Sequence, residues 1–144
     1  MNQTIAIASD HAGFEYKAIL NAHLESKGIQ VQDFGTYSTE PVDYPDFVGP
    51  AAEAVAKDPN TLGIIIGGSG NEEIVANRLR GICCAVVWSD QTARLSKEHG
   101  NCNMIAIGQR LLSQEKAISI VDAWLSAEFK GGRHQKRIDK IDIK

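Results

Sequence analysis

The sequence is poor in cysteine and aromatic residues and has no long apolar run. Its 144 residues include three cysteines, four prolines and 6% aromatic side chains. No apolar stretch approaches the ~18 residues that a membrane-spanning helix needs, and no basic region with an apolar stretch and a small-residue cleavage site opens the chain. We therefore expect a cytoplasmic protein without a membrane partner.

The cysteines are odd in number, and Cys83 and Cys84 are adjacent in an apolar segment. Adjacent residues of a strand point to opposite faces, which is unsuited to a disulfide between them. We predict reduced, buried thiols.

Two nucleotide-binding motifs are absent as well. Residues 9–13 lack the Gly-x-Gly-x-x-Gly spacing of a dinucleotide site, and the glycine turn from Gly67 lacks the Lys-Ser or Lys-Thr ending of a P-loop. A flavodoxin-like or dinucleotide-binding module therefore suits the pattern of elements but not the phosphate chemistry. Bound flavin or nicotinamide in the purified protein would favour that alternative.

Positive charge is concentrated at one end of an acidic chain. The formal net charge is -3, yet residues 130–144 hold six lysines and arginines against two aspartates. A nucleic-acid surface usually needs a broader positive footprint, so we expect no nucleic-acid partner. The basic end indicates either a local anion site or a solvated helix face.

Apolar and amphipathic segments alternate along the chain. The length and the 43% hydrophobic content suit a single domain over 1–144. The pattern predicts strands at 4–9, 30–34, 62–66, 82–87 and 104–107. It predicts helices at 14–27, 44–57, 72–79, 91–99 and 113–125, and a basic C-terminal helix within 131–144 that carries Ile138 and Ile141 on its apolar side. Five βα units predict an α/β fold with a parallel sheet covered on both faces.

Polar residues follow the predicted strands, at the edge where parallel sheets bind ligands. Asp10 and His11 follow the first strand, and Arg110 follows the fifth. The glycine turn after the third strand consists of Gly67, Gly68, Ser69, Gly70 and Asn71, and leads into Glu72 and Glu73. Such a turn can hold an oxyanion while a glutamate takes a carbon-bound proton. A glutamate in the first turn of a helix otherwise complements the helix dipole, worth up to about 1 kcal/mol.

Ordinary structural roles also fit several candidate residues. Asp10 fits a helix N-cap. His99, followed by a glycine, fits a helix C-terminus, although near an active-site mouth it can equally donate a proton to a sugar ring oxygen. Arg133 and Arg137 are four residues apart and share a helix face, so together with Arg110 they form a predicted phosphate grip.

Seven short motifs run through nearly the whole chain. They are Ser-Asp-His-Ala-Gly at 9–13, Asp-Tyr-Pro at 43–45, Gly-Gly-Ser-Gly-Asn at 67–71, Ala-Asn-Arg at 76–78, Glu-His at 98–99, Val-Asp-Ala-Trp-Leu at 121–125 and Gly-Gly-Arg-His-Gln-Lys-Arg at 131–137. Their order and spacing resemble the ribose-5-phosphate isomerase B and galactose-6-phosphate isomerase family. The resemblance implies a three-layer αβα sandwich with a Rossmann-like five-stranded parallel sheet. It also implies a metal-free, cofactor-free interconversion of an aldose phosphate and a ketose phosphate, in a homodimer or tetramer whose active sites are shared between subunits.

The same resemblance implies roles for individual residues. Glu72 is the implied base, Ser69 helps to hold the enediolate oxygen, and His99 is the acid that assists ring opening. Implied substrate-binding positions are Asp10, His11, Gly68, Gly70, Asn71, Gly100, Arg110, Arg133 and Arg137. One branch of the family has a cysteine base at the position of Gly67, so the glycine here resembles the glutamate branch.

The sequence departs from the family pattern at two places. The glutamate branch reads Gly-Ser-Gly-Asn-Gly-Glu, and here the glycine before the glutamate is missing. Counting back from Asn77 puts the base at Glu72, whereas counting forward from Ser69 puts it at Glu73. We favour Glu72 because packing fixes the helix register while a loop absorbs a lost residue. The second departure is Gly100, where the family usually has an asparagine that contacts the sugar.

Two functions therefore follow from the sequence. The first is an isomerase for ribose 5-phosphate, or for another tetrose, pentose or hexose phosphate. The second is a catalytically silent subunit that binds a sugar phosphate, favoured by the shortened turn and by Gly100. Ligand-induced stabilisation without turnover would distinguish the second from the first.

Overall fold

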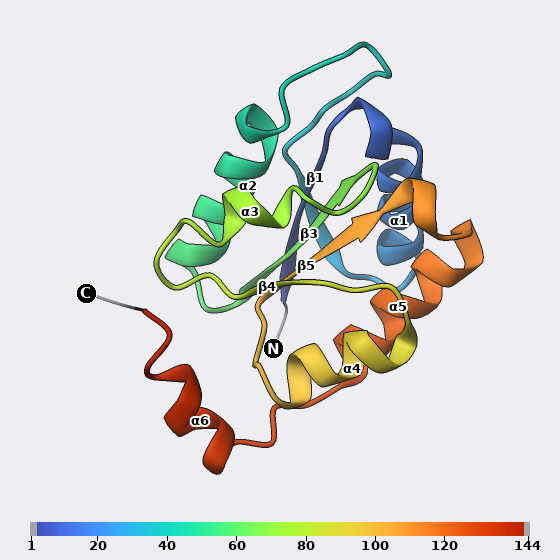
Figure 1. Cartoon of the computed structure of the whole chain (residues 1–144). Coiled ribbons are helices and arrows are strands. Elements are labelled where there is room, and N and C mark those ends of the chain that lie inside the picture. Colours follow the sequence, from blue (N-terminus) through green and yellow to red (C-terminus); the bar gives the residue numbers. More distant parts are fainter. Residues whose placement is uncertain (1–2, 143–144) are drawn as a thin grey trace.

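A single parallel sheet forms the centre of the molecule (Figure 1). The computed structural model describes residues 3–142, so both ends of the predicted 1–144 domain lie outside the described residues. Within them, the strands are β1 (Thr4–Ser9), β2 (Gln30–Asp33), β3 (Thr61–Gly67), β4 (Cys84–Val86) and β5 (Met104–Gly108). The strand order is β2-β1-β3-β5-β4, with every pair parallel. The predicted five-stranded parallel sheet is confirmed.

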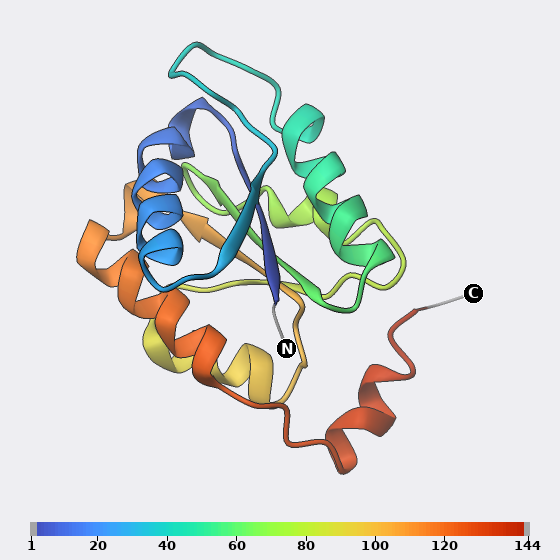
Figure 2. The same cartoon turned by 180° about the vertical axis from the view of Figure 1, so that it is seen from behind.

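Helices cover both faces of the sheet (Figures 1 and 2). One face is covered by α1 (Phe14–Ser26), α4 (Asp90–Glu98) and α5 (Gln114–Ser126), and the other by α2 (Pro45–Lys57) and α3 (Glu73–Ala76). Short 3-10 turns, η1 (His11–Gly13) and η2 (Gln109–Leu111), follow β1 and β5. The result is the three-layer αβα sandwich that the family resemblance implies.

Side-chain alternation along the strands separates two hydrophobic cores. On β1, Ile5 and Ile7 pack in the core of α1, α4 and α5, whereas Ala6 and Ala8 pack in the core of α2 and α3. The first core includes the fully buried Trp124, whose Nε1 donates a hydrogen bond to the Cys102 carbonyl oxygen. Full burial of a large apolar side chain stabilises a fold by about 1.5–3 kcal/mol, so both cores hold the strand ends firmly in place.

The strand register sets the loops of the predicted site side by side. Ser9 of β1 is paired with Ile66 of β3, and Gly67 of β3 is paired with Gly108 of β5. After β1 the chain turns into α1 on one face, and after β3 it turns into α3 on the other. Loops that diverge in this way leave a crevice at the carboxyl ends of the strands.

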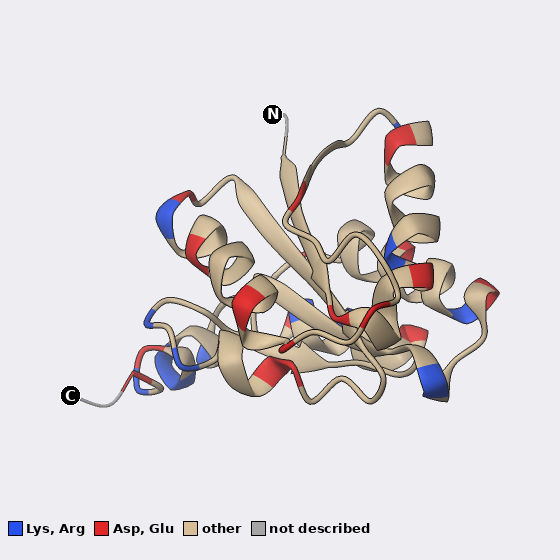
Figure 3. Ribbon diagram, turned by 90° about the horizontal axis from the view of Figure 1, so that it is seen from above, with Lys and Arg blue, Asp and Glu red and all other residues tan. Residues whose placement is uncertain are grey.

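The C-terminal helix α6 (Arg133–Ile138) stands away from the rest of the chain (Figures 1 and 2). Lysine and arginine gather on it, next to the C-terminus (Figure 3). The helix is shorter than predicted: it ends at Ile138, and Ile141 lies beyond it, 58% exposed, at the rim of a cavity. The final two residues of the predicted helix lie outside the described range.

The cysteines depart from the prediction at one position. Cys84 and Cys102 are buried, as expected, but Cys83 is partly exposed because it precedes the edge strand β4. All three are free thiols. Between residues 3 and 142, no helix has the length and apolar content required to cross a bilayer.

Candidate active site

The loop after β1 presents two polar side chains at the edge of the sheet. Asp10 Oδ1 accepts hydrogen bonds from the backbone N–H groups of Ala12 at 2.9 Å and Gly13 at 3.1 Å. Asp10 therefore caps the turn η1, which is the structural role that the sequence suggested for it. His11 Nδ1 accepts a hydrogen bond from the N–H of Val42 at 3.1 Å. In neutral imidazole the proton therefore lies on Nε2, which leaves a donor for a ligand.

An ion pair between a buried lysine and a partly exposed aspartate holds the segment that flanks this loop. Lys17, only 2% exposed, donates to both carboxylate oxygens of Asp33 at 2.8 and 2.7 Å. Asp33 Oδ1 also accepts from the N–H of Gly35 at 2.8 Å, and the Gly35 carbonyl in turn accepts from the N–H of Ser9 at 2.8 Å. Charge-assisted bonds of this kind fix the backbone just before Asp10.

The glycine turn after β3 is shaped around the carboxylate of Glu72. A methyl group on Gly67 would overlap that carboxylate, so only glycine leaves room for it. Gly70 has a φ of 87°, a left-handed conformation that glycine adopts without strain, and this lets the chain turn back toward β3. The carboxylate of Glu72 thus lies directly above the end of β3.

Burial changes the acidity of Glu72. The residue is 5% exposed, and burial raises the pKa of its carboxyl group; the charge of nearby Asp10 raises it further, while the N–H groups of Glu72 and Gly70 partly oppose the increase. Within residues 3–142, Glu72 Oε1 has no hydrogen-bond partner. A buried carboxylate with a raised pKa and a free oxygen is suited to accept a proton from a ligand.

Glu73 has a different environment. Its carboxylate accepts a hydrogen bond from Asn77 Nδ2 at 2.6 Å, and the Asn77 amide also bonds to the backbone N–H and C=O of Cys84. Glu73 therefore belongs to the contact between α3 and β4 rather than to the glycine turn. The geometry favours Glu72 over Glu73 as the acid–base group.

These elements enclose a pocket of about 310 Å³. It is lined by Asp10, His11, Ala12, Tyr44, Gly68, Ser69, Asn71, Glu72 and Arg110. The Arg110 guanidinium lies over Gly68, where a methyl group would come 3.2 Å from its Cζ and Nη1 atoms. Gly70 lies behind this lining, with Val86 and the backbone of β5 around it.

Tyr44 is a lining residue to which we assigned no role from the sequence. It precedes Pro45 at the start of α2, and its presence in the motif at 43–45 was the only signal for it.

The remaining predicted residues lie elsewhere. His99 ends α4, which runs back from the carboxyl to the amino ends of the strands, and its ring stacks on His134 of α6 with 4.4 Å between ring centroids. The Lys130 N–H donates to the Glu98 carbonyl oxygen at 3.0 Å, which places the start of α6 beside the end of α4. Figure 1 shows α6 beyond the amino ends of the strands, far from the arrowheads of β3 and β5. Arg133 and Arg137 are exposed there.

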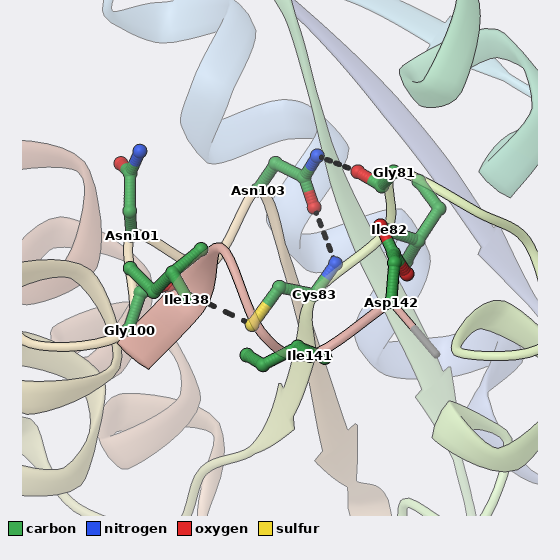
Figure 4. A pocket seen from close by; sticks show the side chains of 9 residues that line it. All are labelled: Gly81, Ile82, Cys83, Gly100, Asn101, Asn103, Ile138, Ile141 and Asp142. Atoms are coloured by element: carbon green, nitrogen blue, oxygen red, sulfur yellow. Dashed lines mark hydrogen bonds between the residues drawn. The ribbon is translucent and has the colours of Figure 1, made fainter. Parts of the chain in front are cut away.

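Gly100 lies in the same region. It lines a second cavity, of about 200 Å³, between α6 and the segment before β5 (Figure 4). A side chain at this position would come within 2.9 Å of the Ser96 carbonyl oxygen and 3.1 Å of Cys102 Sγ, so in this chain an asparagine here would require these neighbours to shift. In one chain, the predicted site residues therefore form two separate groups.

The fold and the pocket define the chain as an α/β protein with a ligand site at the carboxyl ends of a parallel sheet. More specifically, it belongs to the ribose/galactose isomerase family, whose model matches residues 5–141. The family that the sequence motifs resemble is thereby confirmed.

Individual relatives agree with this family over almost their whole length. Ribose-5-phosphate isomerase B of Mycolicibacterium paratuberculosis is 46% identical over 138 residues, which cover 94% of this chain and 87% of the relative. The structure of a ribose 5-phosphate isomerase from Thermotoga maritima has a TM-score of 0.95 and 45% identity, with 99% of both chains covered. The structure of ribose-5-phosphate isomerase B from Mycoplasma genitalium with bound ribulose-5-phosphate has a TM-score of 0.94 and 42% identity, covering 98% of this chain and 95% of that one.

Proposed function

We propose that this protein interconverts ribose 5-phosphate and ribulose 5-phosphate through an enediolate. The observation that carries the proposal is the buried carboxylate of Glu72, which has a raised pKa and a free oxygen and lies above the glycine turn. Relatives that carry the name ribose-5-phosphate isomerase B, one of them with bound ribulose-5-phosphate, support this choice of sugar.

Glu72 acts as the base in this proposal. Its carboxylate removes the proton from C2 of the open aldose, and the C–H electrons form the C1=C2 bond of the enediolate while negative charge moves to O1. The protonated Glu72 then returns the proton to C1 while the O2 proton is transferred to O1, which leaves a C2 ketone and a C1 hydroxyl group. A carboxyl group whose pKa is raised toward the operating pH is better matched to this transfer than an ordinary glutamate.

The glycine turn stabilises the developing charge. Ser69 and Asn71 line the same pocket as Glu72. In this proposal the Ser69 hydroxyl and the backbone N–H groups of the turn donate hydrogen bonds to the oxyanion. Removal of one such donor typically slows a reaction by about 10²–10³-fold. Asp10 and His11 line the same pocket from the loop after β1, and in this proposal they contact the sugar hydroxyls and the ring oxygen during ring opening.

The phosphate grip needs a second copy of the chain. Arg110 is at the pocket, but His99, Arg133 and Arg137 lie beyond the amino ends of the strands of their own subunit. For them to reach a bound sugar phosphate, they must come from a partner. We therefore propose a homodimer in which α6 of each subunit completes the pocket of the other; a tetramer would contain two such pairs.

Proton exchange with solvent tests the activity directly. The purified protein is incubated with ribose 5-phosphate in deuterium oxide and followed by proton NMR. We expect ribulose 5-phosphate to appear, with deuterium entering next to the carbonyl group. Thermal stabilisation by ribose 5-phosphate without any turnover would instead identify a silent binding subunit. Turnover of a tetrose or hexose phosphate alone would change the assigned sugar.

A further inference from the structure

Cys83 and Cys102 lie together at the second cavity, away from the pocket that holds Glu72 in the same chain. The cavity opens between α6 and the segments that precede β4 and β5, and Cys83 is exposed to it (Figure 4). Ile82, Ile138 and Ile141 supply much of its apolar wall. No step proposed for the isomerase uses either thiol, so their proximity requires a separate explanation.

The two sulfur atoms are close enough to react. Cys83 Sγ is 2.8 Å from Cys102 Sγ, a short step from the ~2.05 Å of a disulfide bond. The third thiol, Cys84, points into the opposite core with Ala76 and Met104, because neighbouring strand residues alternate between faces. Cys83 therefore has one possible partner within its own chain, and that partner is Cys102.

The backbone around the pair is held in place. The Asn103 amide accepts a hydrogen bond from the Cys83 N–H at 2.9 Å and donates one to the Gly81 carbonyl oxygen at 2.9 Å (Figure 4). On the other side, the Cys102 carbonyl oxygen accepts from the indole of the buried Trp124. Gly100 leaves space for Cys102 Sγ, because any side chain there would come 3.1 Å from the sulfur. The fold thus keeps the two thiols in contact.

The two thiols also differ in access and acidity. Cys83 is partly exposed, and the hydrogen bond from Cys102 lowers the pKa of the Cys83 thiol. Cys102 is 6% exposed, and donating that bond together with burial raises its pKa. An accessible, more acidic thiol beside a buried second thiol is the arrangement of redox-reactive cysteine pairs.

We propose that Cys83 and Cys102 form a reversible intramolecular disulfide, with a peroxide as the oxidant. The Cys83 thiolate attacks one peroxide oxygen, the O–O bond breaks, and Cys83 becomes a sulfenic acid while hydroxide, or an alkoxide, leaves. Cys102 sulfur then attacks the Cys83 sulfur, the S–O bond breaks, and water leaves with the thiol proton. The two cysteines are oxidised by two electrons in total, and the peroxide is reduced by two. A dithiol reductant reverses the reaction.

Peptide mapping of the native protein tests this site. The folded, reduced protein is treated with a small molar excess of hydrogen peroxide, remaining thiols are alkylated, and the peptides are identified by mass spectrometry. We expect one peptide pair joined through Cys83 and Cys102, a loss of two hydrogens from the intact mass, and an alkylated Cys84. Dithiothreitol added after the peroxide and before alkylation should restore all three thiols.

Variants and controls separate the proposed pair from general thiol oxidation. Cys84→Ser should still form the bond, whereas Cys83→Ser and Cys102→Ser should form none. The wild-type mapping stands even if a variant fails to fold. Three free thiols after treatment, a bond through Cys84, a bond between two chains, or overoxidation of Cys83 without a linked peptide would each overturn the proposal.

Discussion

The two ends of the sheet have been built in different ways. At the carboxyl ends, Asp10 and Glu72 are fixed by strand register, tight turns and burial, and they form a pocket with Arg110 within one chain. At the amino ends, Arg133 and Arg137 are exposed on a helix that projects from the body. The first region has the chemistry for proton transfer, and the second has most of the positive charge for a phosphate.

In the proposed mechanism, this difference separates proton transfer from phosphate binding. The base that takes a proton must be positioned to within a few tenths of an ångström, so it lies in a rigid, buried setting. A phosphate can be held by long, charged side chains that a second subunit supplies. Substitutions in the two regions should therefore affect different kinetic constants.

The largest effect is expected at the base. Glu72→Gln keeps the size of the side chain but cannot accept the C2 proton, so kcat for ribose 5-phosphate should fall by about 10²–10⁴-fold, the usual contribution of a general base. Solvent deuterium exchange should be lost with it. Glu73→Gln is the matched control and should change kcat little, because Glu73 bonds to Asn77 outside the pocket. A greater loss in Glu73→Gln than in Glu72→Gln would reverse the assignment.

A methyl group under the carboxylate should have the next largest effect. Gly67→Ala would displace the Glu72 carboxylate, and a misplacement of about 1 Å can cost about 10²-fold in rate, so kcat should fall by that order. Gly49→Ala in α2, where nothing lies within 4 Å of the added methyl group, is the control for a glycine substitution as such. Wild-type kcat in Gly67→Ala would mean that Glu72 need not occupy this position.

The arginines of α6 should affect binding more than chemistry. Arg137→Ala should raise KM by about 10- to 100-fold with a smaller change in kcat, because a hydrogen bond to a charged group contributes about 1.5–3 kcal/mol. Lys136→Ala on the same helix controls for loss of one positive charge. The KM and kcat of the wild type, Arg137→Ala and Lys136→Ala are compared by steady-state kinetics. Equal KM values in all three would remove α6 from the phosphate site.

A smaller, directional effect is expected in the pH profile. Glu72 must be ionised to accept a proton, so kcat/KM should rise with pH. The midpoint of this rising limb should lie above the ordinary glutamate pKa of 4.5. Asp10→Asn removes the negative charge that helps to raise the pKa of Glu72, so the limb should move to lower pH even though the rate itself falls. A limb that moves to higher pH, or stays in place, would contradict this electrostatic link.

Sequence periodicity predicted most of the fold because β1, β3 and β5 are buried apolar runs and the longer helices α2 and α5 each bury one apolar face. The strand 4–9 matches β1 at both ends, but the strand predicted at 82–87 shortens to Cys84–Val86 because β4 lies at the sheet edge and pairs only with β5. Counting residues back from Asn77 selected Glu72, whose carboxylate lies against Gly67 at the end of β3; its role as the base stays a prediction.

Two aspects of the site required three-dimensional information. The order of the motifs along the chain gives no sign that His99 lies apart from the other predicted site residues. Only the direction of α4 reveals that His99 lies at the amino ends of the strands. The proximity of Cys83 to Cys102 also depends on the start of β4 lying beside the start of β5, which no local pattern predicts.

Subunit complementation tests the central claim, that each active site combines Glu72 of one chain with the α6 arginines of another. Glu72→Gln and the double variant Arg133→Ala, Arg137→Ala are co-expressed with different tags, and the mixed dimer is purified through both tags. One of its two sites then carries every substitution and the other carries none, so its activity at low substrate should be about half that of the wild type, while each parent is nearly inactive. A mixed dimer no more active than its parents would show that Glu72 and the arginines must act within the same chain.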